Sequence, residues 1–144
     1  SHILLSLPND KELPSKSLLI GMKTDRTQQC FKYSEATDAS AILKKILDLY
    51  KDGLSRPIHF FPATSYTYAY EILRGKENDY AISKAEREWT GSRFKPGESD
   101  NAYYRVYPGN ELSINNDNDC DHDFIQTALT VFKPVFEHEE KVRL

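Results

Sequence analysis

The stretch that decides the fold lies between Arg56 and Tyr104. It begins RPIHFFPATSYTYAY at residues 56–70 and finishes EWTGSRFKPGESDNAYY at residues 88–104. It holds the only tryptophan and most of the aromatic residues, with a charged segment of helical pattern between its two ends. Neither a nucleophile–base pair nor a set of metal ligands stands out in it. We therefore expect this stretch to form a surface for packing and for contact with other molecules, and we expect any catalysis to lie outside it.

Two helices are expected inside this stretch, separated by a short polar break. Thr64 or Ser65 can cap the first helix, and Gly75 is placed to end it. The second helix is expected at residues 82–90 and should close near Gly91.

A strand pair and a further helix are expected before the stretch. Residues 17–23, SLLIGMK, form the short apolar run of a buried strand, and residues 29–34, QCFKYS, alternate as a second strand does. A polar turn joins them, so the pair predicts a hairpin. Asp38 or Thr37 can cap the next helix, which has an apolar stripe for the core and which Gly53 can close.

The last helix is expected from about Asp121 to Glu139, with a kink at Pro134. Its apolar residues recur at helical spacing and predict a buried face made of Phe124, Ile125, Ala128, Leu129, Phe132, Val135 and Phe136. This order of elements predicts a mixed α/β (α+β) fold. Residues 1–144 are expected to form one domain, because neither a repeat nor a linker is visible.

The composition is that of a globular protein, with a net charge of −3 and a mean hydropathy of −0.63. A dedicated nucleic-acid binder usually has a strong basic excess, which this chain lacks. No apolar run approaches the roughly 20 residues of a membrane span, and no secretory signal opens the chain. We expect a cytoplasmic fragment of a longer protein, with Cys30 and Cys120 as free thiols.

Metal and catalytic motifs are weak. The acidic run at residues 117–121 resembles the first half of a calcium loop, but His122 and Ala128 stand where such a loop needs glycine and glutamate. Paired zinc ligands at the usual spacing are absent. A Ser–His–acid arrangement stays open, although no nucleophile-elbow pattern supports one. We expect no metal, no cofactor and no catalytic residue.

Basic and aromatic residues gather loosely in the second half of the stretch. This mixture is used by tracks for single-stranded nucleic acid. The candidate contacts to DNA or a partner are Lys84, Arg87, Trp89, Arg93, Lys95, Tyr103, Tyr104 and Arg105, with Phe94 as a further aromatic neighbour. Acidic residues are interspersed, so a salt-bridged face above an aromatic core remains the alternative interpretation.

The motifs, taken in order, resemble the C-terminal domain of RecC, the gamma subunit of exodeoxyribonuclease V (the RecBCD complex). A helix ends in Tyr-x-x-Gly at residues 50–53, and a proline–aromatic segment follows at residues 57–62. Trp-Thr-Gly at residues 89–91 and Gly-Glu-x-Asp-x-x-Tyr at residues 97–103 complete the set. The likeness covers most of the chain.

The resemblance implies a PD-(D/E)xK nuclease-like domain, a small sheet flanked by helices, that has lost its catalytic residues. It implies a non-enzymatic role within an ATP-dependent bacterial helicase/nuclease: supporting assembly and guiding DNA strands in double-strand-break repair and recombination. The implied partners are RecB-like and RecD-like subunits, with DNA bound in the context of the complex and no membrane.

The residues agree with a lost nuclease site. Such a nuclease needs Asp on one strand and Glu/Asp-x-Lys on the next, to bind Mg²⁺ and steady the attacking water. The two expected strands hold no carboxylate, and Glu139-Glu140-Lys141 is expected in a charged helical tail. Two alternatives remain: a small metal-dependent nuclease with an unrecognised site, and a protein-interaction module outside DNA metabolism.

Overall fold

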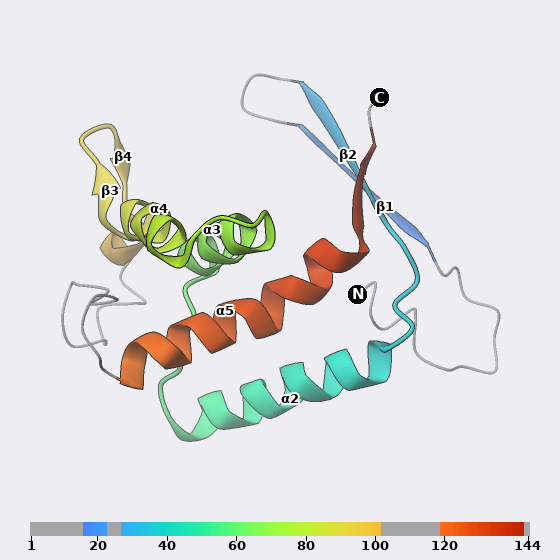
Figure 1. The fold of residues 1–144 in the computed structure, drawn as a ribbon, viewed down its shortest axis with the longest axis horizontal. Coiled ribbons are helices and arrows are strands. Elements are labelled where there is room, and N and C mark those ends of the chain that lie inside the picture. Colours follow the sequence, from blue (N-terminus) through green and yellow to red (C-terminus); the bar gives the residue numbers. More distant parts are fainter. Residues whose placement is uncertain (1–15, 23–26, 102–118, 143–144) are drawn as a thin grey trace. The chain divides into compact units, whose positions relative to one another are not determined.

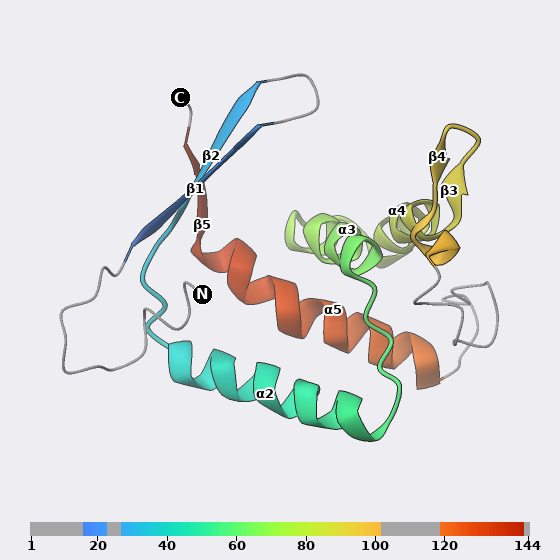
Figure 2. The ribbon, with the colours of Figure 1, turned by 180° about the vertical axis from the view of Figure 1, so that it is seen from behind.

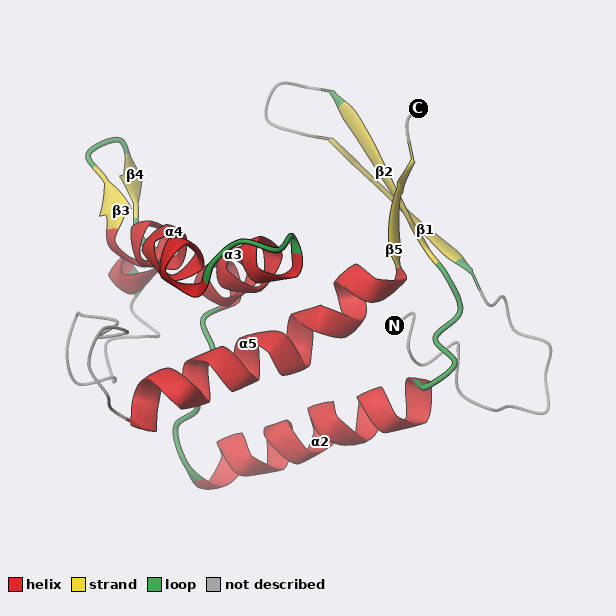
Figure 3. Ribbon diagram, viewed as in Figure 1, coloured by secondary structure: helices red, strands yellow, loops and turns green. Residues whose placement is uncertain are grey.

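The computed structural model describes residues 16–22, 27–101 and 119–142 (Figure 1). Within these ranges the chain forms four helices, five short strands and one 3₁₀ turn, so the predicted mixed α/β class is confirmed (Figure 3). The chain divides into two compact units. The first unit comprises residues 1–50 and 134–144, and the second unit comprises residues 51–133.

A three-stranded antiparallel sheet belongs to the first unit (Figure 2). Strand β1 (Ser17–Met22) pairs with β2 (Gln28–Tyr33), which confirms the predicted hairpin. On its other side β2 pairs with β5 (Glu139–Val142). The prediction of a helical tail at Glu139 was therefore wrong, because this segment is extended and uses β2 as its template.

The prediction that β1 is buried was also wrong. As the edge strand of the order β1-β2-β5, it has only one neighbour among the described strands. Its large apolar side chains are between 55% and 72% exposed; they are Leu18, Leu19, Ile20 and Met22. A short apolar run indicates only that a strand is suited to being covered.

Helix α2 (Ala39–Ser55) begins where predicted. The carbonyl of Asp38 accepts hydrogen bonds from the amides of Ala41 and Ile42, at 2.9 and 3.0 Å. In the first unit it buries Ala39 and Ile42, which form a small core with Ala36. The prediction that Gly53 closes this helix was wrong, because Arg56 N still bonds to Asp52 O at 3.0 Å.

Helix α3 (Pro62–Leu73) opens the second unit's helical core. Proline stands at its first turn, where a missing N–H costs nothing, so the helix begins earlier than a Thr64 or Ser65 cap would allow. That capping prediction was wrong: both side chains are buried inside the first turn. Gly75, with a φ of +77°, follows the helix end as predicted.

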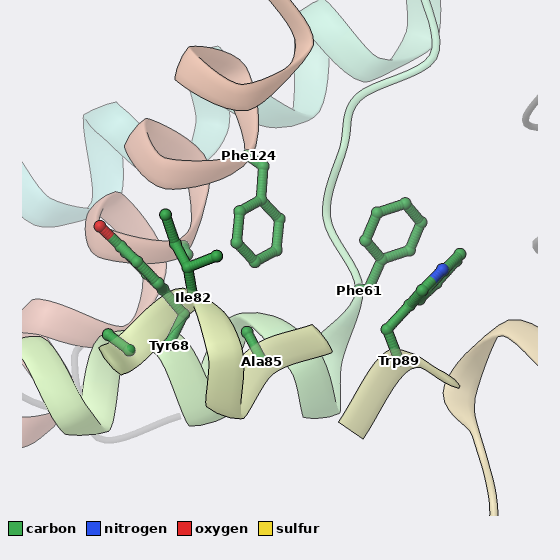
Figure 4. Packing of buried hydrophobic residues seen from close by; sticks show 8 residues of the cluster. Phe61, Tyr68, Ile82, Ala85, Trp89 and Phe124 are labelled. Carbon is green, nitrogen blue, oxygen red and sulfur yellow. The ribbon is translucent and has the colours of Figure 1, made fainter. Parts of the chain in front are cut away.

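Helix α4 (Asn78–Thr90) starts four residues before the predicted start and packs along α3. Ala81 and Ala85 are fully buried on α4 and allow this close approach. Phe61 lies 4.4 Å from Trp89 between ring centroids, and Tyr68 lies 5.6 Å from Phe124 (Figure 4).

Phe124 is carried by helix α5 (Asp119–His138), which confirms the predicted last helix to within two residues. Phe124 and Ala128 are buried, and Ile125 and Leu129 pack against the same cluster. Pro134 lies inside the helix. Among the described residues, no helix has both the length and the apolar character needed to cross a bilayer.

Candidate functional site

The second half of the aromatic stretch contains a small hairpin that the sequence did not predict. Strand β3 (Gly91–Ser92) pairs antiparallel with β4 (Lys95–Pro96), and Arg93 and Phe94 form the turn between them. A 3₁₀ turn, η1 (Glu98–Asp100), follows directly. The hairpin therefore follows directly after the C-terminus of α4.

Four of the predicted cationic contact residues lie on α4 and on the hairpin that follows it. Arg87 is exposed in the last turn of α4, and Arg93 and Lys95 are exposed on the hairpin. Lys84 lies further back on α4, with its Nζ 5.3 Å from the ring centre of Tyr80. These four cations are thus spread over α4 and the hairpin that follows it.

Trp89 is placed differently from the cations. It is 3% exposed and belongs to the second unit's core, so its ring is not part of the surface. Tyr103, Tyr104 and Arg105 lie outside the described residues.

Side-chain hydrogen bonds hold the hairpin in place. Ser92 Oγ accepts from the backbone amides of Phe94 and Lys95, at 3.3 and 3.2 Å. The Nζ of Lys95 pairs with Glu88 on α4 at 2.5 Å. At the base, Ser99 Oγ donates to the carbonyl oxygen of Trp89 at 2.8 Å. The turn is therefore attached to the same helix that carries the core tryptophan.

Glu98 explains much of the Gly-Glu-x-Asp motif. Its carboxylate accepts from Ala63 N at 3.1 Å, Thr64 N at 2.7 Å and Thr64 Oγ1 at 2.8 Å. These amides belong to the first turn of α3, where N–H groups lack helical partners and negative charge is favourable. Asp100 accepts from Gly97 N at 2.9 Å and fixes the 3₁₀ turn. Both carboxylates therefore stabilise the fold: Glu98 caps α3, and Asp100 fixes the 3₁₀ turn.

Glu98→Ala is expected to destabilise the protein by about 1–2 kcal/mol, because two amides of the first turn of α3 lose a charged acceptor. Urea unfolding followed by Trp89 fluorescence measures the change. Glu35→Ala is the control, since Glu35 is exposed and should change stability by less than about 0.5 kcal/mol. Equal effects of the two substitutions would show that Glu98 does not cap α3.

A second polar cluster lies around Asp123 on α5. Its carboxylate accepts from the Arg56 guanidinium at 3.2 and 3.3 Å. The backbone amide of His59 donates to it at 3.4 Å, and His59 Nδ1 lies at the same distance. Burial raises the pKa of Asp123, but the hydrogen bonds from Arg56 and His59 outweigh burial, so its pKa lies below the ordinary value. The carboxylate is charged at neutral pH and ties the proline–aromatic segment to α5.

The depressed pKa predicts a pH-dependent contribution to stability. A carboxyl group with a lower pKa in the folded state stabilises fully above its ordinary value, here 3.8, and stops stabilising as the pH falls through its folded value. Asp123→Asn should therefore cost about 1–3 kcal/mol at pH 7 and progressively less below pH 3.8. Urea unfolding across this pH range measures both values.

Asp52→Asn is the matched control for this prediction. Asp52 also pairs with Arg56, at 2.5 Å, but both side chains are about half exposed and four residues apart on the chain. Exposed pairs of this kind contribute little. A cost for Asp123→Asn that stayed constant down to the lowest pH at which the chain is folded would contradict the assigned pKa direction.

Comparison with known families assigns the chain to a protein family. The family model described as the RecC C-terminal domain matches residues 1–73, half of the 144-residue chain. The chain belongs to the RecC C-terminal domain family. No curated protein and no solved structure matches the chain. The match covers the Tyr-x-x-Gly and proline–aromatic segments of this RecC domain, and the motifs at Trp89 and Gly97 lie beyond it.

The Glu-x-Lys sequence of this RecC domain lies on a strand, contrary to the prediction. Glu139 and Lys141 on β5 stand opposite Tyr33 and Phe31 on β2. Glu139 Oε2 accepts from the Tyr33 hydroxyl at 3.1 Å, and Glu140 pairs with Lys32 at 3.4 Å. Both glutamates therefore make cross-strand contacts.

A nuclease would need a further carboxylate beside Glu139. The next strand, β1, has Ser17 opposite Tyr33 and Leu19 opposite Phe31. Across the described ranges, no three His, Cys, Asp or Glu residues are grouped so that they could hold a metal ion. The described strands thus supply the Glu-x-Lys half of a nuclease motif without an acidic partner strand.

Proposed function

We propose that this RecC C-terminal domain is a non-catalytic, PD-(D/E)xK nuclease-like domain that supports assembly of a helicase–nuclease and helps to guide DNA strands in double-strand-break repair and recombination. Its partners are RecB-like and RecD-like subunits, and it meets DNA within their complex. The family match carries this proposal. The Glu-x-Lys strand without an acidic neighbour supports a degenerate nuclease site.

An assembly role is supported by the edge strand β1. Exposed apolar edge strands are prone to pair with other chains, and proteins normally cover or charge them. Here Leu18 and Ile20 are more than 60% exposed, as is Met22. We assign this strand to contact with a partner subunit.

The assembly role is tested by co-purifying the chain with RecB-like and RecD-like subunits. The wild-type chain is expected to be recovered with them, and Ile20→Lys should reduce that recovery. Leu54→Lys is the control, because Leu54 is an equally exposed apolar residue on α2, outside the sheet. Failure of the wild-type chain to join either subunit would favour an interaction module outside DNA metabolism.

A metal-dependent nuclease is the competing function, and the strand context of Glu139 and Lys141 is the observation that favours it. Incubation of a labelled duplex with the chain and Mg²⁺ or Mn²⁺ separates the two proposals. A structural domain leaves the duplex intact. Cleavage that disappears in Glu139→Gln would overturn the non-catalytic proposal.

We also propose that residues 1–144 act as one domain. Both boundaries between the two units lie within helices, after Tyr50 in α2 and before Pro134 in α5. Domain boundaries usually fall in exposed linkers rather than inside helices. A single unfolding transition, with the same midpoint by circular dichroism and by Trp89 fluorescence, supports this proposal. Two separate transitions would contradict it.

A further inference from the structure

Phe94 is an unusual side chain for its position. It occupies the turn of the β3–β4 hairpin and is 92% exposed, the most exposed of the large apolar side chains in the described part of the chain. The guanidinium of Arg93 lies 6.0 Å from the centre of its ring. Lys95 follows it and is exposed as well. An aromatic ring thus stands in solvent between two cationic residues.

The sequence of the turn is not explained by the turn itself. Hairpins with two-residue turns favour Asn-Gly, Asp-Gly or Gly-containing pairs, because these residues accept the backbone angles that such turns require. Arg93 and Phe94 are neither small nor among the residues that such turns favour. A local rule broken without a packing gain is typical of a functional position.

The hairpin presents Phe94 from a fixed base. Gly91 and Gly97 lie at the two strand ends, close to each other and to the last turn of α4. A Cβ atom added at either glycine would overlap backbone atoms. Ser92 ties both Phe94 and Lys95 through their amides, and Lys95 is paired with Glu88. A hairpin backbone fixed in this way loses little conformational freedom when Phe94 binds a ligand.

We propose that Phe94 is a stacking platform for an unpaired base of single-stranded DNA, with the Arg93 guanidinium contacting the adjacent phosphate. This inference rests on the proposed role in guiding DNA strands. Base–aromatic stacking needs one open ring face and tolerates any sequence. Lys95 is engaged by Glu88, so Arg93 is the cation assigned to the phosphate.

A protein partner fits this hairpin less well. Aromatic anchors of protein interfaces usually sit within a well-packed patch that excludes water. The residues around Phe94 on the hairpin are polar, charged or proline, and all are exposed; they are Ser92, Arg93, Lys95 and Pro96. Such surroundings suit a phosphate-bearing ligand better than an apolar groove.

The test compares two ligands that carry the same phosphates. Fluorescence anisotropy at low salt measures binding of the 144-residue chain to labelled oligothymidine and to an abasic strand of equal length. Phe94→Ala should weaken oligothymidine binding by about fivefold to a hundredfold and leave abasic binding unchanged. Phe94→Tyr should bind as the wild type does. Arg93→Gln should weaken both ligands equally and reduce the salt dependence.

Further variants control for unfolding and for unspecific contact. Tyr50→Ala removes another exposed aromatic ring, on α2, and should leave binding unchanged. Phe94→Trp places an indole at the turn, and its fluorescence should be quenched by oligothymidine, while Trp89 is buried in the core.

Four results would overturn the inference. One is oligothymidine binding that Phe94→Ala leaves unchanged, and another is an equal loss for the abasic strand. The third is a Phe94→Ala chain that binds DNA normally but no longer joins the RecB-like or RecD-like subunits, which would make Phe94 a protein anchor. A wild-type chain that binds no single strand would also end the inference, while successful co-purification would leave the assembly role standing.

Discussion

Phe124→Ala is expected to lower the free energy of unfolding by about 3–5 kcal/mol. Phe124 is 2% exposed, and its ring packs 5.6 Å from that of Tyr68 and 6.4 Å from that of Phe61. Truncation removes this buried area and leaves a cavity among rings and helices that are already fixed by their own contacts. Urea unfolding followed by fluorescence of the buried Trp89 measures the loss.

Phe94→Ala is the matched control for Phe124→Ala. It makes the same chemical change at a side chain that is 92% exposed, so stability should change by less than about 0.5 kcal/mol. The difference between the two variants isolates burial from helix or strand propensity. If both variants lost the same stability, the ring cluster of the second unit would not be the core of the folded chain.

The sequence predicted those elements whose apolar spacing repeats. Strands β1 and β2 and helices α2 and α5 were all found close to their predicted bounds, because a short apolar run, an alternating pattern and helical spacing each indicate the type of element. It could not predict what covers them. The exposed side chains of β1 are of the same apolar residue types as those of a buried strand.

Strand β5 was missed because its own residues carry no strand pattern. Glu139 and Glu140 are poor strand formers, and the pair continues directly from a helix. Their extended conformation depends on partners more than a hundred residues away, through the contacts with Tyr33 and Lys32. A local pattern contains no information on such pairing.

The candidate site was predicted in part. The mixture of cations and aromatic residues led to Arg87, Arg93 and Lys95, which the structure places on the surface of α4 and its hairpin. The sequence also held a signal that Trp89 faces inward. It follows Ala81 and Ala85 at intervals of four, which is the spacing of one helix face. Phe94, three residues past the Gly91 that ends α4, has no such relation and is exposed.

Gly97→Ala is expected to cost at least about 3 kcal/mol, because a Cβ at this position would overlap backbone rather than a movable side chain. It would meet the carbonyl oxygen of Trp89 and lie 2.6 Å from the amide nitrogen of Gly91. Relief requires the hairpin to move away from α4. That movement would also break the Ser99 hydrogen bond to Trp89 and displace Glu98 from the first turn of α3.

Substitutions at two other glycines separate the cost of steric overlap from the cost of backbone conformation. Gly75→Ala tests backbone conformation alone, since its φ is +77° and nothing lies within 4 Å of the added Cβ; about 1–2 kcal/mol is expected. Gly21→Ala, in an open position on β1, should cost nothing. Urea unfolding ranks the three variants. A Gly97→Ala chain as stable as Gly75→Ala would show that the hairpin is loosely attached, and a loosely attached hairpin would not present Phe94 as a preorganised ring.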